Sequence, residues 1–375
     1  IFLLICIALL SAISGIVVYM IKKKSVEKKL IVLSADALVT EDLKLLETLP
    51  NYRKYLADGN SARKWMVNNQ AFSFCDNYWL CDVAHDMSFE KYLELFNDID
   101  TFDVIANRDT VYGKENCTLG GKLEKFWFRS DGDVYLAKKN PPNLDVLSIR
   151  EMFAHTVYEA QGIPSVEYLP VYNKEQCLCG CVCKSFTNRS CELITAYDIL
   201  AANGETQEDD VYERIIARAV ELGASEQKVR DYMDAQTIVD YLITNRDRHQ
   251  GNIGFLRDSK TRQIISPAPI FDSGSSIYFE NELPLSATNT TVNGLYKTEM
   301  ECLSHVKNWS VIDAAKLPDR NTFSKYLNLS SELTESRKEK MLNLYEEKVT
   351  LFAKMQKEKL LQSAEKKRAS CEIER

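Results

Sequence analysis

Residues 245–252 read Asn-Arg-Asp-Arg-His-Gln-Gly-Asn, and twenty residues after Asn252 comes the tripeptide Asp272-Ser273-Gly274. Phosphoryl transfer asks a protein mainly to position the reactants and to neutralise charge. One carboxylate stands beside the attacking hydroxyl, while an Asn and an Asp hold Mg²⁺ against the phosphates. The spacing therefore predicts Asp247 beside the acceptor hydroxyl, with Asn252 and Asp272 as metal ligands. A lone Asp-x-x-x-x-Asn is also a common loop composition, because both residues favour turns.

The secondary structure predicted for the flanking sequence supports this interpretation of the motif. Residues 229–243 contain no Pro or Gly and carry apolar residues at helical spacing, which predicts a helix that ends at the motif. Residues 253–256 predict a short strand, and residues 264–271 predict a second extended stretch that leads into Asp272. Helix, loop, hairpin and metal-binding Asp is the order that a kinase C-lobe requires.

Length and composition limit the size of the core, the number of lobes and the classes of partner that we expect. The chain has 375 residues, of which 45% are hydrophobic and 27% charged, so it can bury a substantial core and is expected to form two lobes. Its net charge of −7 argues against a general nucleic-acid binder, and we expect no direct nucleic-acid binding.

Cysteines alternate at positions 177, 179, 181 and 183, four of the eleven in the chain. On a strand this spacing places all four side chains on one face. The run lacks the C-x₂-C spacing of structural zinc sites. Small buried thiols on a strand are the favoured interpretation, with a zinc or redox site as the alternative.

The first 21 residues contain no charged side chain and are followed at once by Lys22, Lys23 and Lys24. A helix of this length spans roughly 32 Å, which is enough to cross a bilayer. We therefore predict a transmembrane helix over residues 1–21 in the cytoplasmic membrane, with the lysines and the rest of the chain in the cytoplasm. If the natural start is Met20, the protein is instead expected to be cytoplasmic.

The remaining chain divides into three regions. Residues 22–110 form a juxtamembrane and N-terminal region. Residues 111–187 predict a small strand-rich lobe with a hairpin around residues 127–137 and a helix over residues 147–161. Residues 188–375 predict a mainly helical lobe that ends in charged amphipathic helices.

A nucleotide site also needs groups that contact the phosphates. The segment around Thr118, Gly120 and Gly121 offers backbone N–H groups that can approach an anion closely, although paired glycines usually mark a turn. Lys138 stands where a strand lysine would touch the phosphates, and Lys139 would point to the opposite face. Glu151, in the following helix, is the candidate partner of that lysine; solvated surface positions are the alternative for both residues.

With these pieces in order, the chain resembles the bacterial HipA-like serine/threonine kinases over roughly residues 46–351. The resemblance is carried by residues 118–125, 135–138, 184–186, 245–252 and 268–276, with a weaker element at 72–79. It implies an α+β, two-lobed, protein-kinase-like fold, the cofactors ATP and Mg²⁺, and transfer to Ser or Thr of a protein substrate. The transmembrane segment is not part of the usual family pattern.

The resemblance also implies roles for individual residues. His249 would brace the catalytic loop around Asp247. Lys184, Ser185 and Phe186 would form the hinge beside adenine. Thr118 is the nearest candidate for autophosphorylation in the glycine loop, because some family members switch off in this way.

Two other functions stay open at this point. Asp-Arg-His-x-x-Asn is also similar to the catalytic-loop pattern of phosphatidylinositol kinases, and a membrane anchor would bring such an enzyme to its lipid. A non-catalytic nucleotide-binding scaffold is the third reading, although all three expected catalytic groups are present.

Overall fold

The computed structural model describes most of the chain after residue 122 and four short segments before it. The described residues are 17–22, 30–34, 75, 78–82, 123–188, 190–201, 210–277 and 289–373. Thr118, Gly120 and Gly121 lie outside these ranges, as do most of residues 22–110. The predictions made for them therefore stay predictions.

The smaller lobe contains a four-stranded antiparallel sheet with the order β4-β5-β7-β6. Its strands are β4 (Lys125–Ser130), β5 (Asp133–Lys139), β6 (Leu169–Tyr172) and β7 (Leu178–Lys184). The expected hairpin joins β4 to β5, and its two turn residues, Asp131 and Gly132, both have positive φ values of 51° and 81°. Such turns match the right-handed twist of the flanking strands, so this hairpin is encoded locally.

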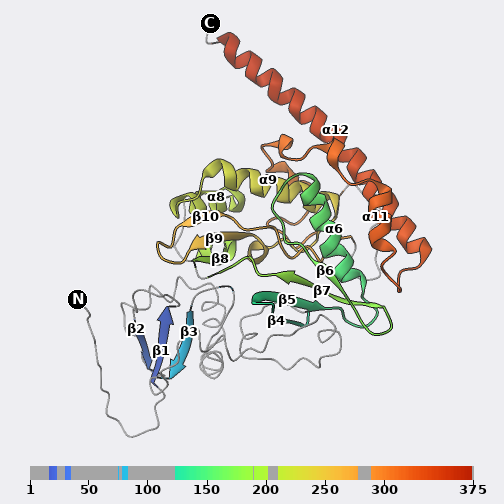
Figure 1. Ribbon diagram of the computed structural model, residues 1–375. Coiled ribbons are helices and arrows are strands. Elements are labelled where there is room, and N and C mark those ends of the chain that lie inside the picture. Colours follow the sequence, from blue (N-terminus) through green and yellow to red (C-terminus); the bar gives the residue numbers. More distant parts are fainter. Residues whose placement is uncertain are drawn as a thin grey trace.

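Helix α6 (Val146–Ala160) packs against β6 and β7 (Figure 1). It agrees with the helix expected over residues 147–161. Its apolar face is fully buried at Ile149, Phe153 and Val157, and Glu151 projects from the same helix. Burial of this face fixes the helix on the sheet and thereby fixes the position of Glu151.

The cysteine run does not lie on one face, so that prediction is wrong. Cys181 and Cys183 pack into the main core, while Cys179 packs with Val171 and Val182 on the other side of the sheet. The reason is a register shift between β6 and β7 at Val171/Tyr172, where the paired residue in β7 changes from Gly180 to Leu178. A bulge of this kind interrupts the alternation of side chains.

The larger lobe begins with a three-stranded antiparallel sheet of order β10-β9-β8. Its strands are β8 (Cys191–Thr195), β9 (Gly254–Asp258) and β10 (Ile264–Pro267). Helix α9 (Glu226–Leu242) precedes the 245–252 stretch, as predicted. After β10, Ile270 forms backbone hydrogen bonds with Pro164 and Val166 of the smaller lobe, at 3.0 and 2.9 Å. These bonds join the segment before Asp272 to the segment that follows α6.

Further helices complete the larger lobe. They are α7 (Ala196–Ala201), α8 (Val211–Glu221), α10 (Glu299–Ser304), α11 (Arg320–Leu327) and α12 (Glu335–Ile373), with short 3₁₀ turns η2 (Gln250–Asn252), η3 (Trp309–Val311) and η4 (Ala314–Lys316). The first half of α12 buries Met341, Tyr345 and Phe352, and the rest projects away from the body (Figure 1).

The predicted transmembrane helix is wrong for residues 17–21. Strand β1 (Val17–Lys22) pairs antiparallel with β2 (Leu30–Ser34) and β3 (Tyr78–Asp82) in a sheet of order β2-β1-β3. The segment Val-Val-Tyr-Met-Ile is rich in β-branched and aromatic residues, which fit a pleated surface. Among the described helices, none has the length and hydropathy to cross a bilayer. Residues 1–16 lie outside the described ranges, and membrane attachment stays a prediction.

Candidate active site

Lys138 lies at the centre of the site, where side chains from three elements meet. The side chain of this β5 residue is buried, and its ammonium contacts Glu151 of α6 and Asp272 Oδ1, the latter at 2.8 Å. Lys139 points to the other face of the strand, and its Nζ atom lies 3.7 Å from Glu124 Oε1. Strand alternation therefore assigns the interior position to Lys138.

The charges in this cluster stabilise one another. Burial alone would lower the pKa of Lys138, but the carboxylates of Asp272 and Glu151 outweigh it and raise the pKa well above the usual value. The ammonium in turn holds the pKa of Asp272 far below its usual range, against the opposing effect of burial. At neutral pH the site therefore contains a cation beside an ionised carboxylate, the charge state that phosphate and metal binding require.

The Asp272-Ser273-Gly274 turn rests on Glu151. The backbone N–H of Ser273 donates to Glu151 Oε2 at 2.8 Å. A Cβ added at Gly274 would lie 3.2 Å from Glu151 Oε1, so the glycine permits this close approach. Asp272 itself has a φ of 57°, a left-handed conformation that Asp tolerates better than most residues. One glutamate thus orients both Lys138 and the turn that carries Asp272.

Asp247, His249 and Asn252 come together in the loop after α9. The side-chain amide nitrogen of Asn252 donates to the Asp247 carbonyl oxygen at 2.8 Å, and this bond does not use its Oδ1 atom. His249 Nδ1 accepts from the Gly251 N–H at 3.0 Å, so a neutral imidazole carries its proton on Nε2. That Nε2 atom lies 4.0 Å from Asp247 Oδ1.

Asp240 and Arg248 have structural roles in the site that the motifs did not predict. The buried Arg248 guanidinium pairs with Asp240 through two hydrogen bonds of 2.9 and 3.1 Å. Its Nη1 atom also donates to the carbonyl oxygens of Asn252 and Phe271, at 3.0 and 2.7 Å, and Nη2 donates to Ser273 Oγ at 3.0 Å. One side chain thereby brings the loop that carries Asn252 beside the segment that carries Asp272.

A signal for Asp240 was present in the sequence. It lies in the predicted helix among Ile238, Val239, Tyr241 and Leu242, all of which are buried. A carboxylate on such a face needs a buried partner, and Arg248 in the adjacent motif supplies it. Burial would lower the pKa of Arg248, but interactions with its neighbours, of which Asp240 is the foremost, together outweigh this effect and raise the pKa.

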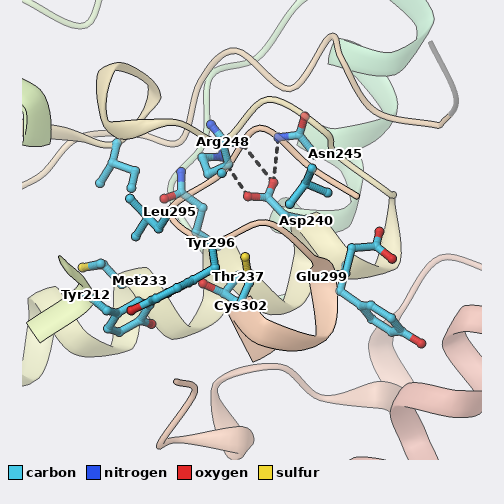
Figure 2. A pocket seen from close by; sticks show the side chains of 15 residues that line it. Tyr212, Met233, Thr237, Asp240, Asn245, Arg248, Leu295, Tyr296, Glu299 and Cys302 are labelled. Atoms are coloured by element: carbon cyan, nitrogen blue, oxygen red, sulfur yellow. Dashed lines mark hydrogen bonds and ion pairs between the residues drawn. The ribbon is translucent and has the colours of Figure 1, made fainter. Parts of the chain in front are cut away.

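Behind the loop lies a cavity of about 40 Å³. Figure 2 shows Asp240, Asn245 and Arg248 joined by hydrogen bonds along one side of it, with Tyr296 and Cys302 among the side chains that surround it. Asn245 donates to Asp240 Oδ1 at 2.9 Å.

The expected hinge residues have different surroundings. The exposed ammonium of Lys184 pairs with Asp133 of the β4–β5 hairpin at 2.6 Å. The Ser185 N–H donates to the Val134 carbonyl at 2.8 Å, which extends the β5–β7 ladder. The ring of Phe186 stacks on Phe271 with a centroid distance of 6.0 Å. Of the three, Phe186 therefore lies beside the segment that leads into Asp272.

The chemistry of Asn252 and Asp272 is suited to Mg²⁺. This ion uses one or two carboxylates together with substrate phosphates and water, rather than a complete protein cage. An amide oxygen and an ionised carboxylate, brought together by Arg248, provide such a partial set. Within the described ranges no group of three or more His, Cys, Asp or Glu side chains is placed to hold a metal, and the cysteine run forms no such group.

The chain is similar to one family model and to solved structures. Residues 117–347, more than half of the chain, match the model of the HipA-like C-terminal domain. Among solved structures, the Helicobacter pylori proinflammatory kinase CtkA is 18% identical with a TM-score of 0.51, over 65% of this chain and 93% of that one. HipA of Shewanella oneidensis, solved with HipB and operator DNA, is 12% identical with a TM-score of 0.48, over 85% of this chain and 86% of that one.

No curated protein matches the chain. The similarity to CtkA extends over nearly all of that kinase and shows a kinase-like fold of mixed α/β composition, as expected. The match to the family model covers both Lys138 and Asp272 as well as the whole 245–252 stretch. The chain belongs to the HipA-like C-terminal domain family, and the family predicted from its motifs is confirmed.

Proposed function

We propose that the chain is a serine/threonine protein kinase that uses Mg²⁺ and ATP. The observation that carries the proposal is the convergence of Lys138, Glu151 and Asp272, with Arg248 joining this cluster to the loop of Asp247 and Asn252. An ion pair that only stabilised the fold would need one cation and one carboxylate from this set. The full set supplies a phosphate-binding cation, two metal ligands and a carboxylate for the acceptor.

Each residue has a separate task in this proposal. Lys138 binds phosphate oxygens of ATP, and Asn252 with Asp272 holds Mg²⁺, which neutralises the charge that develops on the phosphates. Asp247 orients the acceptor hydroxyl and accepts its proton as the oxygen bonds to the γ-phosphorus and the bond to ADP breaks. Glu151 contacts no substrate and keeps Lys138 and the Asp272 turn in place.

The test is transfer of label from γ-labelled ATP in the presence of Mg²⁺. The acceptors are the chain itself, a mixed Ser/Thr peptide library and vesicles that contain phosphatidylinositol. Wild type should label protein or peptide, and both Asp247→Ala and Asp272→Asn should lose at least about a hundredfold of this activity. Asp258→Asn is the matched control and should keep this activity; Asp258 ends β9, and its carboxylate accepts from the N–H groups of Lys260 and Thr261 in the β9–β10 turn.

Other results would redirect the assignment. Label found only in lipid would replace the protein kinase by a lipid kinase. Nucleotide binding without any transfer or ADP release would instead favour a scaffold. Phosphopeptide mapping of the labelled chain tests Thr118, and a map without phospho-Thr118 would remove autophosphorylation at that residue.

A further inference from the structure

Arg246 is hydrogen-bonded to both ends of the segment that follows Asp272. Its backbone N–H donates to the Ser275 carbonyl at 3.2 Å. Its carbonyl oxygen accepts from the Asn293 N–H at 2.7 Å, and its Nε donates to the Thr291 carbonyl at 3.3 Å. The chain thus leaves the site at Asp272 and returns to the residue that directly precedes Asp247.

The returning segment ends in a well-defined turn. The Val292 N–H donates to the Lys297 carbonyl at 2.9 Å, and Thr291 and Thr298 pair in an isolated antiparallel β-bridge. Thr298 then begins α10 with a capping box to Glu301. Such reciprocal capping fixes the helix start and the turn before it. The position of Asn293 is therefore determined by the backbone, although its side chain is exposed.

The side chain of Asn293 contacts the proposed catalytic carboxylate. Its Nδ2 atom donates to Asp247 Oδ1 at 2.6 Å. His249 Nε2, a titratable group, lies 4.0 Å from the same oxygen. Within the described part of the chain both contacts are to Oδ1, so the other carboxylate oxygen is available to an acceptor hydroxyl. The Asp247 side chain is 40% exposed, so an acceptor can reach it.

We infer that Asn293 is a positioning residue that orients the carboxylate of Asp247 for phosphoryl transfer. The inference rests on the proposed kinase function. A carboxylate turns readily about its terminal torsion, and the amide of Asn293 selects one orientation. Asn293 ends the segment that begins at Asp272. The proposed metal ligand therefore lies at one end of this segment, and the residue that orients Asp247 lies at the other.

Kinetics of Asn293 variants provide the first test. Asn293→Ala should lower kcat about tenfold or more with KM for ATP within about twofold, since orientation is lost and nucleotide contacts remain. Asn293→Gln, which keeps the amide, should recover part of the loss. Asn343→Ala is the control, because Asn343 is an exposed asparagine with one side-chain hydrogen bond to Arg320, at 2.8 Å. A higher kcat in Asn293→Ala would overturn the inference, because Asn293 would then obstruct the acceptor.

Placing a charge at residue 293 separates positioning from a merely structural role. Asn293→Asp keeps the shape of the side chain but puts a second carboxylate against Asp247, so kcat should fall further than in Asn293→Ala. The two variants are compared in a His249→Gln background as well, so that an effect transmitted through the imidazole is not mistaken for one on Asp247. Equal kcat values in Asn293→Asp and Asn293→Ala in both backgrounds would contradict the inference.

A readout independent of turnover keeps the two proposals distinguishable. The carboxyl ¹³C chemical shift of Asp247, assigned by loss of the signal in Asp247→Asn, is compared between wild type and Asn293→Ala at one fixed pH. Loss of the amide donor should move this chemical shift, and an identical value would overturn the contact itself. If the chemical shift moves but wild type transfers no phosphate to any acceptor, the proposed function fails while the Asn293–Asp247 contact stands, and the catalytic role inferred for it is rejected.

Discussion

Asp240 and Arg248 form a buried ion pair in which Arg248 Nε lies 2.9 Å from Asp240 Oδ2. Asp240 belongs to α9, whereas Arg248 lies in the loop between Asp247 and Asn252. The same guanidinium donates to the carbonyl oxygen of Phe271, directly before Asp272. Arg248 thereby links the loop to the turn that is proposed to bind the metal, and it touches no substrate in the proposed mechanism.

We expect Arg248→Met to lower the free energy of unfolding by about 3–5 kcal/mol, because it leaves the Asp240 carboxylate buried without its cation. The double variant Asp240→Asn/Arg248→Met should recover part of this loss. Arg320→Met is the control. Arg320 pairs with the exposed residues Glu339 and Glu346, and such pairs contribute about 0–1 kcal/mol. Urea unfolding followed by circular dichroism measures all three, and equal losses in the two single variants would contradict the prediction.

Lys138→Met should weaken binding of Mg-ATP about tenfold or more. A charged hydrogen bond contributes about 1.5–3 kcal/mol, and each 1.4 kcal/mol is about a factor of ten in affinity. Lys139→Met removes the same charge from the opposite face of β5 and should change affinity less than about twofold. Isothermal titration calorimetry on both variants makes the comparison. Similar losses would mean that overall charge, and not the position of Lys138, determines binding.

The four cysteines of the 177–183 run should differ in reactivity. Cys177 is exposed, whereas Cys181 and Cys183 are buried and burial raises the pKa of both thiols to about 12. Because the thiolate is the reactive form, N-ethylmaleimide at neutral pH should modify Cys177 in the folded protein and leave Cys181 and Cys183 unmodified. Peptide mass spectrometry reads this out, with urea-unfolded protein as the fully reactive control. Modification of all four at equal rates would refute the assigned burial.

Acid should remove a stabilising contribution at Glu213. Hydrogen bonds from Arg230 are the main reason that the pKa of Glu213 is lowered to about 2, from an ordinary value of 4.5. A depressed pKa contributes stability that is present above the unfolded value and is lost as pH falls towards the folded one. The Tm difference between wild type and Glu213→Gln should therefore be largest at pH 6 and disappear between about pH 5 and pH 2. A difference that stays constant over this range would exclude the ion pair as its source.

Individual helices and hairpins could be predicted because neighbouring residues in the sequence determine them. Residues 229–243 carry helical periodicity, and Asp131-Gly132 fits a tight hairpin, so α9 and the β4–β5 hairpin agree with their predictions. Two local predictions are wrong for physical reasons. Strand pairing on both sides of β1 takes residues 17–21 into a sheet, and the bulge at Val171/Tyr172 turns Cys179 away from Cys181.

By itself, the sequence determined the family and the spacing of Asp247, Asn252 and Asp272, because those groups lie close together along the chain. Only the tertiary structure decided which groups surround them. Glu151 and Asn293 lie far from their partners in sequence, and no periodicity encodes a contact of Glu151 with Ser273 or of Asn293 with Asp247. Such contacts form only when packing of the helices and sheets brings distant segments together. A buried charge such as that of Glu151 is then stable only beside a partner from another segment.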